Sequence, residues 1–154
     1  SLEFNIIKKF SVIHEKFFLA HLNNKINVFW NEKYLNWRYI KNPRSKYFSY
    51  EFFLKEKLIG YVVMKEYLSD KEKIGHICLL IANKKYKEEI IKFTNNFFLK
   101  RKIYKLSLWS LDYNLMKRTG FNKKFSNKKN IVYSGKLNLK KQNFDINMGF
   151  SDIY

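Results

Sequence analysis

Apolar and polar residues alternate along the middle of the chain in a way that predicts three strands. In Tyr47–Lys55 every second residue is aromatic or aliphatic and most residues between them are polar, which is typical of a strand with one buried face. Leu58–Tyr67 is also apolar, and its Gly60 suits a bulge or a close approach. Ile74–Ala82 is apolar almost throughout, as expected of a central strand. Short polar turns join the three, so we expect an antiparallel meander.

A long amphipathic helix and a further strand follow this meander. Over Lys84–Arg101 the apolar residues recur every three or four positions, which predicts a helix with one buried face. That face carries Tyr86, Ile90, Ile91, Phe93, Thr94, Phe97 and Phe98. Ile103–Leu111 has the pattern of a strand. Because strand–helix–strand is a crossover unit, we expect this strand to run parallel to Ile74–Ala82.

Two shorter helices are expected before the meander, after a short first strand within Phe4–Phe10. Ser11 can cap a helix that runs to about Leu22. Its buried face is expected to carry Ile13, Phe17 and Ala20 or His21. Asn31 can cap a second helix that ends before Pro43. We expect this second helix to dock through its aromatic residues, with Arg38 stacked between them or paired with a carboxylate.

The end of the chain predicts a short helix and a strand pair. Asp112 can cap a helix that ends at Gly120. After a basic loop at Asn122–Asn130, Ile131–Leu139 and Phe144–Tyr154 suit two final strands. The element order predicts an α+β fold, with a mixed, mostly antiparallel central sheet flanked by helices and one parallel strand–helix–strand crossover. We expect residues 1–154 to form one domain, and we leave open that the chain is a piece of a longer protein.

The formal charge of +18 raises the question of a nucleic-acid partner. Lys, Asn, Ile, Phe and Tyr dominate the composition, and all five have codons made only of A and T, so an AT-rich genome accounts for much of the lysine. Only four basic residues are arginine, the residue that most often reads base edges. A basic nucleic-acid-binding module is therefore the weaker interpretation, resting mainly on the loop at Asn122–Asn130. The charge will still attract anionic small molecules.

The remaining composition narrows the class of protein. The chain has one cysteine, Cys78, within an apolar run, so we expect a buried, inert thiol and a reducing, cytoplasmic compartment. No apolar run approaches the ~20 residues that span a bilayer. His14 and His21 lie seven positions apart on their helix, whereas two metal ligands on a helix favour three or four, so no metal site is predicted.

Several short motifs, taken in order, resemble a known family. They are Trp37-Arg38-Tyr39 followed by Asn42-Pro43, the strand that begins Lys57-Leu58-Ile59-Gly60, Arg118-Thr119-Gly120-Phe121, and the closing residues Asn147–Asp152. With the element order, they resemble the GCN5-related N-acetyltransferase (GNAT) superfamily across nearly the whole chain. The first motif is similar to a subgroup often associated with bacterial surface-sugar biosynthesis.

The resemblance implies that acetyl-CoA or another acyl-CoA binds between the fourth and fifth strands, with its pyrophosphate at the start of the long helix. Unpaired backbone N–H groups and the helix dipole favour an anion there. The residues that the resemblance places around the cofactor are Leu80, Ile81, Ala82, Asn83, Lys84, Lys85, Lys87, Ser110 and Asn114. The family's glycine-rich turn is absent at Ala82–Lys87. Either the three lysines supply the charge that binds the phosphates, or the phosphate site has been lost.

Candidate catalytic residues also follow from the resemblance and from residue chemistry. The family's general acid is a tyrosine four residues before the glycine of the Gly-Phe pair, and Met116 occupies that position. Tyr113 lies about one helical turn earlier and could reach the same cleft, although it could equally be a packing aromatic. His76 could serve as a general base near neutral pH, or be structural.

Three functions are therefore weighed. The first is an acyl-CoA-dependent N-acyltransferase that transfers acetyl to an amine of a small metabolite or sugar nucleotide, with an acceptor that could be anionic. The second is a non-catalytic domain of the same fold, serving in a tandem or fused protein or in a homodimer. The third is the basic nucleic-acid-binding module.

Overall fold

The computed structural model describes residues 2–21, 30–69, 71–108 and 113–120. The basic loop at Asn122–Asn130 and the two final strands expected after it lie outside the described residues. Ser110 and Asp112 also lie outside them.

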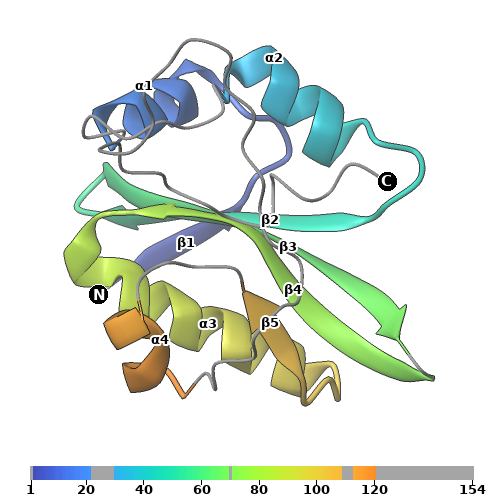
Figure 1. Ribbon diagram of the computed structural model, residues 1–154. Coiled ribbons are helices and arrows are strands. Elements are labelled where there is room, and N and C mark those ends of the chain that lie inside the picture. Colours follow the sequence, from blue (N-terminus) through green and yellow to red (C-terminus); the bar gives the residue numbers. More distant parts are fainter. Residues whose placement is uncertain (1, 22–29, 70, 109–112, 121–154) are drawn as a thin grey trace, which may run out of the picture.

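Five strands form one sheet in the order β1-β2-β3-β4-β5 (Figure 1). Their bounds are β1 Glu3–Ile6, β2 Tyr47–Leu54, β3 Lys57–Ser69, β4 Glu72–Ala82 and β5 Leu106–Leu108. β1 to β4 pair in antiparallel fashion, and β5 pairs with β4 in parallel. The predicted meander and the parallel crossover are therefore confirmed, as is the α+β class.

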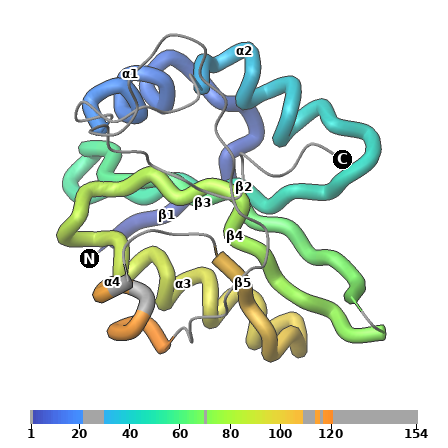
Figure 2. Tube along the Cα trace, viewed as in Figure 1, coloured from blue at the N-terminus to red at the C-terminus, as the bar shows by residue number. Residues whose placement is uncertain are grey.

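Helices cover both faces of this sheet. α1 Val12–Ala20 and α2 Glu32–Leu35, which continues as the π-helical turn Asn36–Ile40, lie on one face. α3 Lys87–Lys100 lies on the other, preceded by a 3₁₀ turn at Lys84–Tyr86, and α4 Tyr113–Arg118 lies close to it (Figure 2). Each face has its own apolar core. Among the described residues, no helix is long and apolar enough to cross a membrane.

The buried face of α1 differs from the predicted one. The helix buries His14 and Phe18, whereas Ile13 is 47% exposed. Ala20 is also exposed, while Phe17 packs partly against the core and His21, the alternative to Ala20 on the expected face, is partly buried. Apolar residues occur on every side of this short helix, so their spacing did not select a face. The choice follows from His14, whose ring nitrogens find polar partners inside.

The second helix docks as expected. The side chain of Asn31 accepts a hydrogen bond from the Tyr34 N–H at 2.8 Å, which confirms the predicted cap. Arg38 is buried, donates to the Tyr34 hydroxyl at 2.8 Å, and lies over the rings of Tyr34 and Tyr39. Tyr39 stacks on the fully buried Trp30. The aromatic residues therefore hold this helix to the sheet.

Two irregularities shape the central strands. The register between β3 and β4 shifts by one residue at Cys78, so that Cys78 and Leu79 both pack in the core under α1. A second shift occurs beside Gly60, where an added Cβ would lie 2.7 Å from both Ala82 Cβ and Ile90 Cδ1. Gly60 thus marks both the bulge and the close approach that the sequence allowed, and it lets β4 turn directly into α3.

Candidate functional site

The turn from β4 into α3, at Ala82–Lys87, is fastened to two neighbouring elements. The Asn83 N–H donates to the Ile59 carbonyl of β3 at 2.9 Å. The Asn83 side-chain oxygen lies 2.7 Å from Nε2 of His21, at the end of α1. The turn is therefore held in place by contacts on both sides, although it contains no glycine.

The His21 ring joins α1 to this turn. Its Nδ1 lies 2.7 Å from the Phe17 carbonyl, which can only accept, so Nδ1 carries a proton. The contact with Asn83 is then satisfied either by a doubly protonated ring or by the Asn83 amide turned so that its NH₂ donates. The sequence did not reveal this contact, because His21 and Asn83 lie far apart in the chain.

Positive charge gathers at the start of α3. Lys84 and Lys85 are exposed and Lys87 is partly exposed, as an anion site would need. α4 adds Arg118, whose Nε lies 3.6 Å from the Glu88 carboxylate. Sequence reasoning missed Arg118 as a contributor, because only the fold brings α4 to this helix terminus.

Two carboxylates oppose this charge, because Glu88 and Glu89 lie in the first turn of α3. Glu88 is paired with cations, because Lys92 Nζ lies 3.1 Å from its carboxylate. This hydrogen bond, together with the charges of Lys92 and Arg118, lowers the pKa of the Glu88 carboxyl. The start of α3 remains a place where exposed cations and backbone N–H groups meet.

His76 lies in the middle of β4, on the face opposite α3. Its ring stacks on Tyr67, with centroids 3.9 Å apart and planes within 7°. Its Nδ1 contacts the Ser107 hydroxyl of β5, and its exposed fraction is 9%. Six residues of strand separate it from Ala82, roughly 20 Å. The structure thus brings His76 together with Tyr67 and Ser107, a partnership that the sequence did not indicate.

The other predicted site residues lie in different parts of the molecule, and some of their side chains are outside the described residues. Leu80 packs toward the core under α3, and Ile81 is buried in the core under α1. Tyr113 begins α4, but its side chain and that of Met116 lie outside the described part of the molecule. Asn114 is exposed on α4. The described pairing of β5 with β4 ends at Leu108, opposite Ile77.

The sequence also did not indicate a buried network of hydrogen-bonded side chains under α1. His14 Nε2 lies 3.0 Å from a Glu51 carboxylate oxygen, and its Nδ1 accepts from the Ser11 N–H at 3.1 Å. Burial raises the pKa of the adjacent Tyr61 hydroxyl. These contacts cap α1 and tie it to β2, so we assign them to the structure rather than to chemistry.

Comparison with solved structures identifies the fold. No family description and no curated protein matches the sequence. An acetyltransferase of Trypanosoma brucei matches over 86% of this chain and 100% of its own, with 14% identity and a TM-score of 0.64. An aminoglycoside acetyltransferase from an uncultured soil metagenomic sample, in complex with sisomicin, matches over 88% and 97%, with 13% identity and a TM-score of 0.59.

A third match is a predicted acetyltransferase from Clostridium acetobutylicum with acetyl-CoA, which covers 90% of this chain and 97% of its own at 13% identity and a TM-score of 0.57. The chain therefore has the fold of the GCN5-related N-acetyltransferases. Identities this low establish the fold, while the chemistry of the site has to be argued from the residues themselves.

Proposed function

We propose that the chain is an acyl-CoA-dependent N-acyltransferase that transfers acetyl to an amine of a small metabolite or sugar nucleotide. The observation that carries this proposal is the anchored turn at Ala82–Lys87. It leads into a 14-residue helix whose start is surrounded by Lys84, Lys85, Lys87 and Arg118. Acetyl-CoA in one structural neighbour of the same fold supports the choice of cofactor.

The cations and the backbone at this turn would hold the cofactor's phosphates. Where related enzymes use glycines to let the backbone approach, this chain has flexible lysines that can reach outward. Without an anion, cations in the first turn of a helix oppose its dipole at a cost of about 0.3–1 kcal/mol each. A bound diphosphate removes that cost, which favours binding.

Bound acyl-CoA would supply an activated thioester, and residues of the chain would transfer the protons. In this proposal His76 would accept a proton from the attacking acceptor amine, and Tyr113 would donate a proton to the departing sulfur. The Ser107 hydroxyl at Nδ1 and the Tyr67 ring fix the orientation of the His76 imidazole.

A calorimetric titration with acetyl-CoA at low ionic strength tests the binding. We expect saturable binding that weakens at least tenfold in the double variant Lys84→Glu, Lys85→Glu. The matched control is Lys71→Glu, Lys73→Glu, which makes the same charge change at the far end of β4, about 30 Å away. Absence of binding, or equal weakening in both double variants, would contradict the proposed site.

The second candidate is a non-catalytic domain of the same fold. It is favoured by the missing glycines and by Met116 in place of the family's tyrosine. Release of free thiol from acetyl-CoA in the presence of amino sugars separates the two functions. The non-catalytic alternative is eliminated if the whole chain turns over acetyl-CoA and if His76→Gln lowers the turnover rate without changing the affinity for acetyl-CoA.

A further inference from the structure

The side of α1 that faces solvent is largely apolar. α1 turns His14 and Phe18 toward the sheet. The exposed residues on the opposite side of the helix are Val12, Ile13, Lys16, Leu19 and Ala20. The side chains of Val12, Ile13 and Leu19 are 52%, 47% and 42% exposed. A helix that packs on a sheet normally directs polar residues outward, so apolar side chains gathered on this side indicate a surface that another partner covers.

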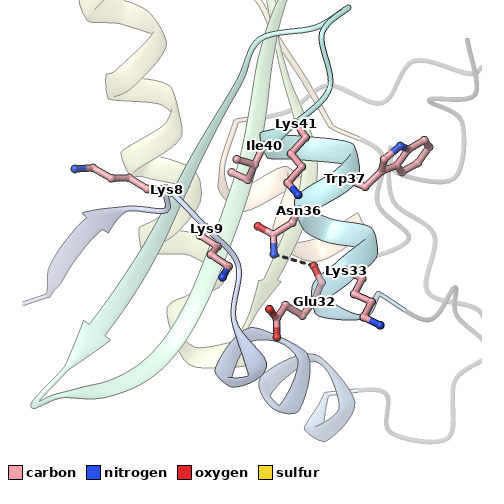
Figure 3. Close-up of a pocket in the computed structure, with 8 residues that line it drawn as sticks. All are labelled: Lys8, Lys9, Glu32, Lys33, Asn36, Trp37, Ile40 and Lys41. Atoms are coloured by element: carbon pink, nitrogen blue, oxygen red, sulfur yellow. Dashed lines mark hydrogen bonds between the residues drawn. The ribbon is translucent and has the colours of Figure 1, made fainter.

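The helix formed by α2 and Asn36–Ile40 has an outer side of the same character. It buries Leu35 and Tyr39. Its exposed residues, together with the residue that follows it, are Lys33, Trp37, Ile40 and Lys41. Trp37 is 65% exposed, and Figure 3 shows its side chain extending away from Lys9. Because α1 and this helix lie on the same face of the sheet (Figure 1), the sides opposite their buried residues both point away from it.

Hydrogen bonds fix the two helices to each other. The Glu32 N–H, at the start of α2, donates to the Glu15 carboxylate of α1 at 2.9 Å. The Asn36 side chain accepts from the Phe10 N–H and donates to the Phe10 carbonyl, each at 2.8 Å. The exposed residues of both helices, with Lys8 and Lys9 just before Phe10, therefore belong to one surface of fixed shape. We call it the outer α1–α2 surface.

The charge of the outer α1–α2 surface is positive. Its lysines are Lys8, Lys9, Lys16, Lys33 and Lys41, and all are exposed. None of the ion pairs within the described residues involves them. Four of them line a concave region of about 440 Å³ between the β1–α1 connection and the second helix. The carboxylates of the two helices, Glu15 and Glu32, are only partly exposed. Exposed cations thus surround the exposed apolar side chains.

This combination fits the surface of a lipid bilayer with anionic headgroups. Apolar side chains enter the boundary between headgroups and acyl chains, while lysines next to them contact the negative headgroups. A second copy of the chain fits less well, because each copy carries a formal charge of +18 and the two surfaces would repel each other.

We propose that the outer α1–α2 surface docks on an anionic lipid bilayer. Val12, Ile13, Leu19 and Trp37 enter the headgroup region, and the surrounding lysines contact lipid phosphates. The proposal does not depend on acyltransfer, because none of its residues belongs to the β4–α3 turn, and α3 lies on the opposite face of the sheet.

Flotation of the whole chain with lipid vesicles at physiological ionic strength tests the apolar contribution. We expect binding to phosphatidylcholine vesicles with about 30% phosphatidylglycerol, and at least tenfold weaker binding to phosphatidylcholine alone. Ile13→Gln with Leu19→Gln keeps the charge and should weaken binding to the anionic vesicles about tenfold. The matched control is Leu68→Gln with Leu99→Gln, which changes two exposed leucines outside this surface and should leave binding unchanged.

Two further variants test the lysines and the tryptophan. Lys9→Glu with Lys16→Glu should weaken binding more than Lys71→Glu with Lys73→Glu, which makes the same charge change elsewhere. Tryptophan emission should shift to shorter wavelength when anionic vesicles are added, because the exposed Trp37 enters a less polar environment. Trp37→Phe should remove this shift and keep most of the affinity.

Three results would overturn the proposal. The first is no binding to the anionic vesicles. The second is binding that Ile13→Gln with Leu19→Gln, in a folded variant, does not weaken, since the chain would then adsorb by charge alone. The third is a dimer in sedimentation that the same double variant dissociates, without vesicle binding, because the surface would then be an interface between copies.

Discussion

Asn36 shows how one side chain can join two segments that are far apart in the chain. It is 8% exposed and satisfies both backbone groups of Phe10 as well as the Glu32 carbonyl. A side-chain amide can do this because it carries a donor and an acceptor side by side. The sequence indicated a docked aromatic helix, but Asn36 within it carried no signal of this role.

The change Asn36→Asp tests this role with almost no change in shape. The new carboxylate oxygen would face two carbonyl oxygens, so we expect a loss of about 2 kcal/mol in the free energy of unfolding. Urea denaturation measures it. Asn42→Asp is the control, because Asn42 only accepts a hydrogen bond, from the Arg44 N–H, and an aspartate still can. An equal effect of both changes would contradict the assignment.

At the scale of single elements, α3 ends in a motif that normally contains glycine. The N–H of Lys102 donates to the Leu99 carbonyl and that of Ile103 to the Phe98 carbonyl, which is a Schellman motif. Lys102 sits at its left-handed position with φ of 58°. Ile103 then packs beside Phe98 in the core under α3. A side chain at such a position costs roughly 1–2 kcal/mol relative to glycine.

Lys102→Gly should therefore raise the free energy of unfolding by roughly 1 kcal/mol, after the larger entropy loss of glycine on folding is subtracted. Lys100→Gly, two residues earlier and inside the helix, should lower it by up to about 1 kcal/mol. Thermal and urea unfolding of the two variants measure this opposite response. A loss of stability in both would show that the helix does not end as described.

Elements differ in how well the sequence predicts them. β2, β3, β4 and α3 follow from residue patterns, because β2 alternates in sequence, β3 and β4 carry continuous apolar runs that are buried, and α3 buries one regular face. The burial of Ser49 in β2 does not follow from that pattern, which placed it on the polar face. α1 does not, because its inward face depends on Glu51, which a reader of the helix alone does not see. The bulge at Cys78 and the π-helical turn after α2 likewise depend on tertiary contacts.

At the scale of the whole molecule, the crossover from β4 through α3 to β5 fixes the position of the proposed cofactor site. The order of elements could be predicted because short turns require neighbouring strands to pair, and a helix between strands requires a crossover. The contributions of His21 and Arg118 to the site could not, because α1 and α4 approach the turn only once the sheet and α3 have assembled.

The central claim is that acyl-CoA binds at the start of α3, and hydrogen–deuterium exchange of the whole chain with and without acetyl-CoA tests it most directly. Binding to the folded state slows exchange at the amides it covers and stabilises. We expect slower exchange at residues 83–90, with little change at residues 33–41. The account is contradicted if saturating acetyl-CoA leaves the exchange rates of residues 83–90 unchanged. It is also contradicted if acetyl-CoA slows exchange only at residues 33–41.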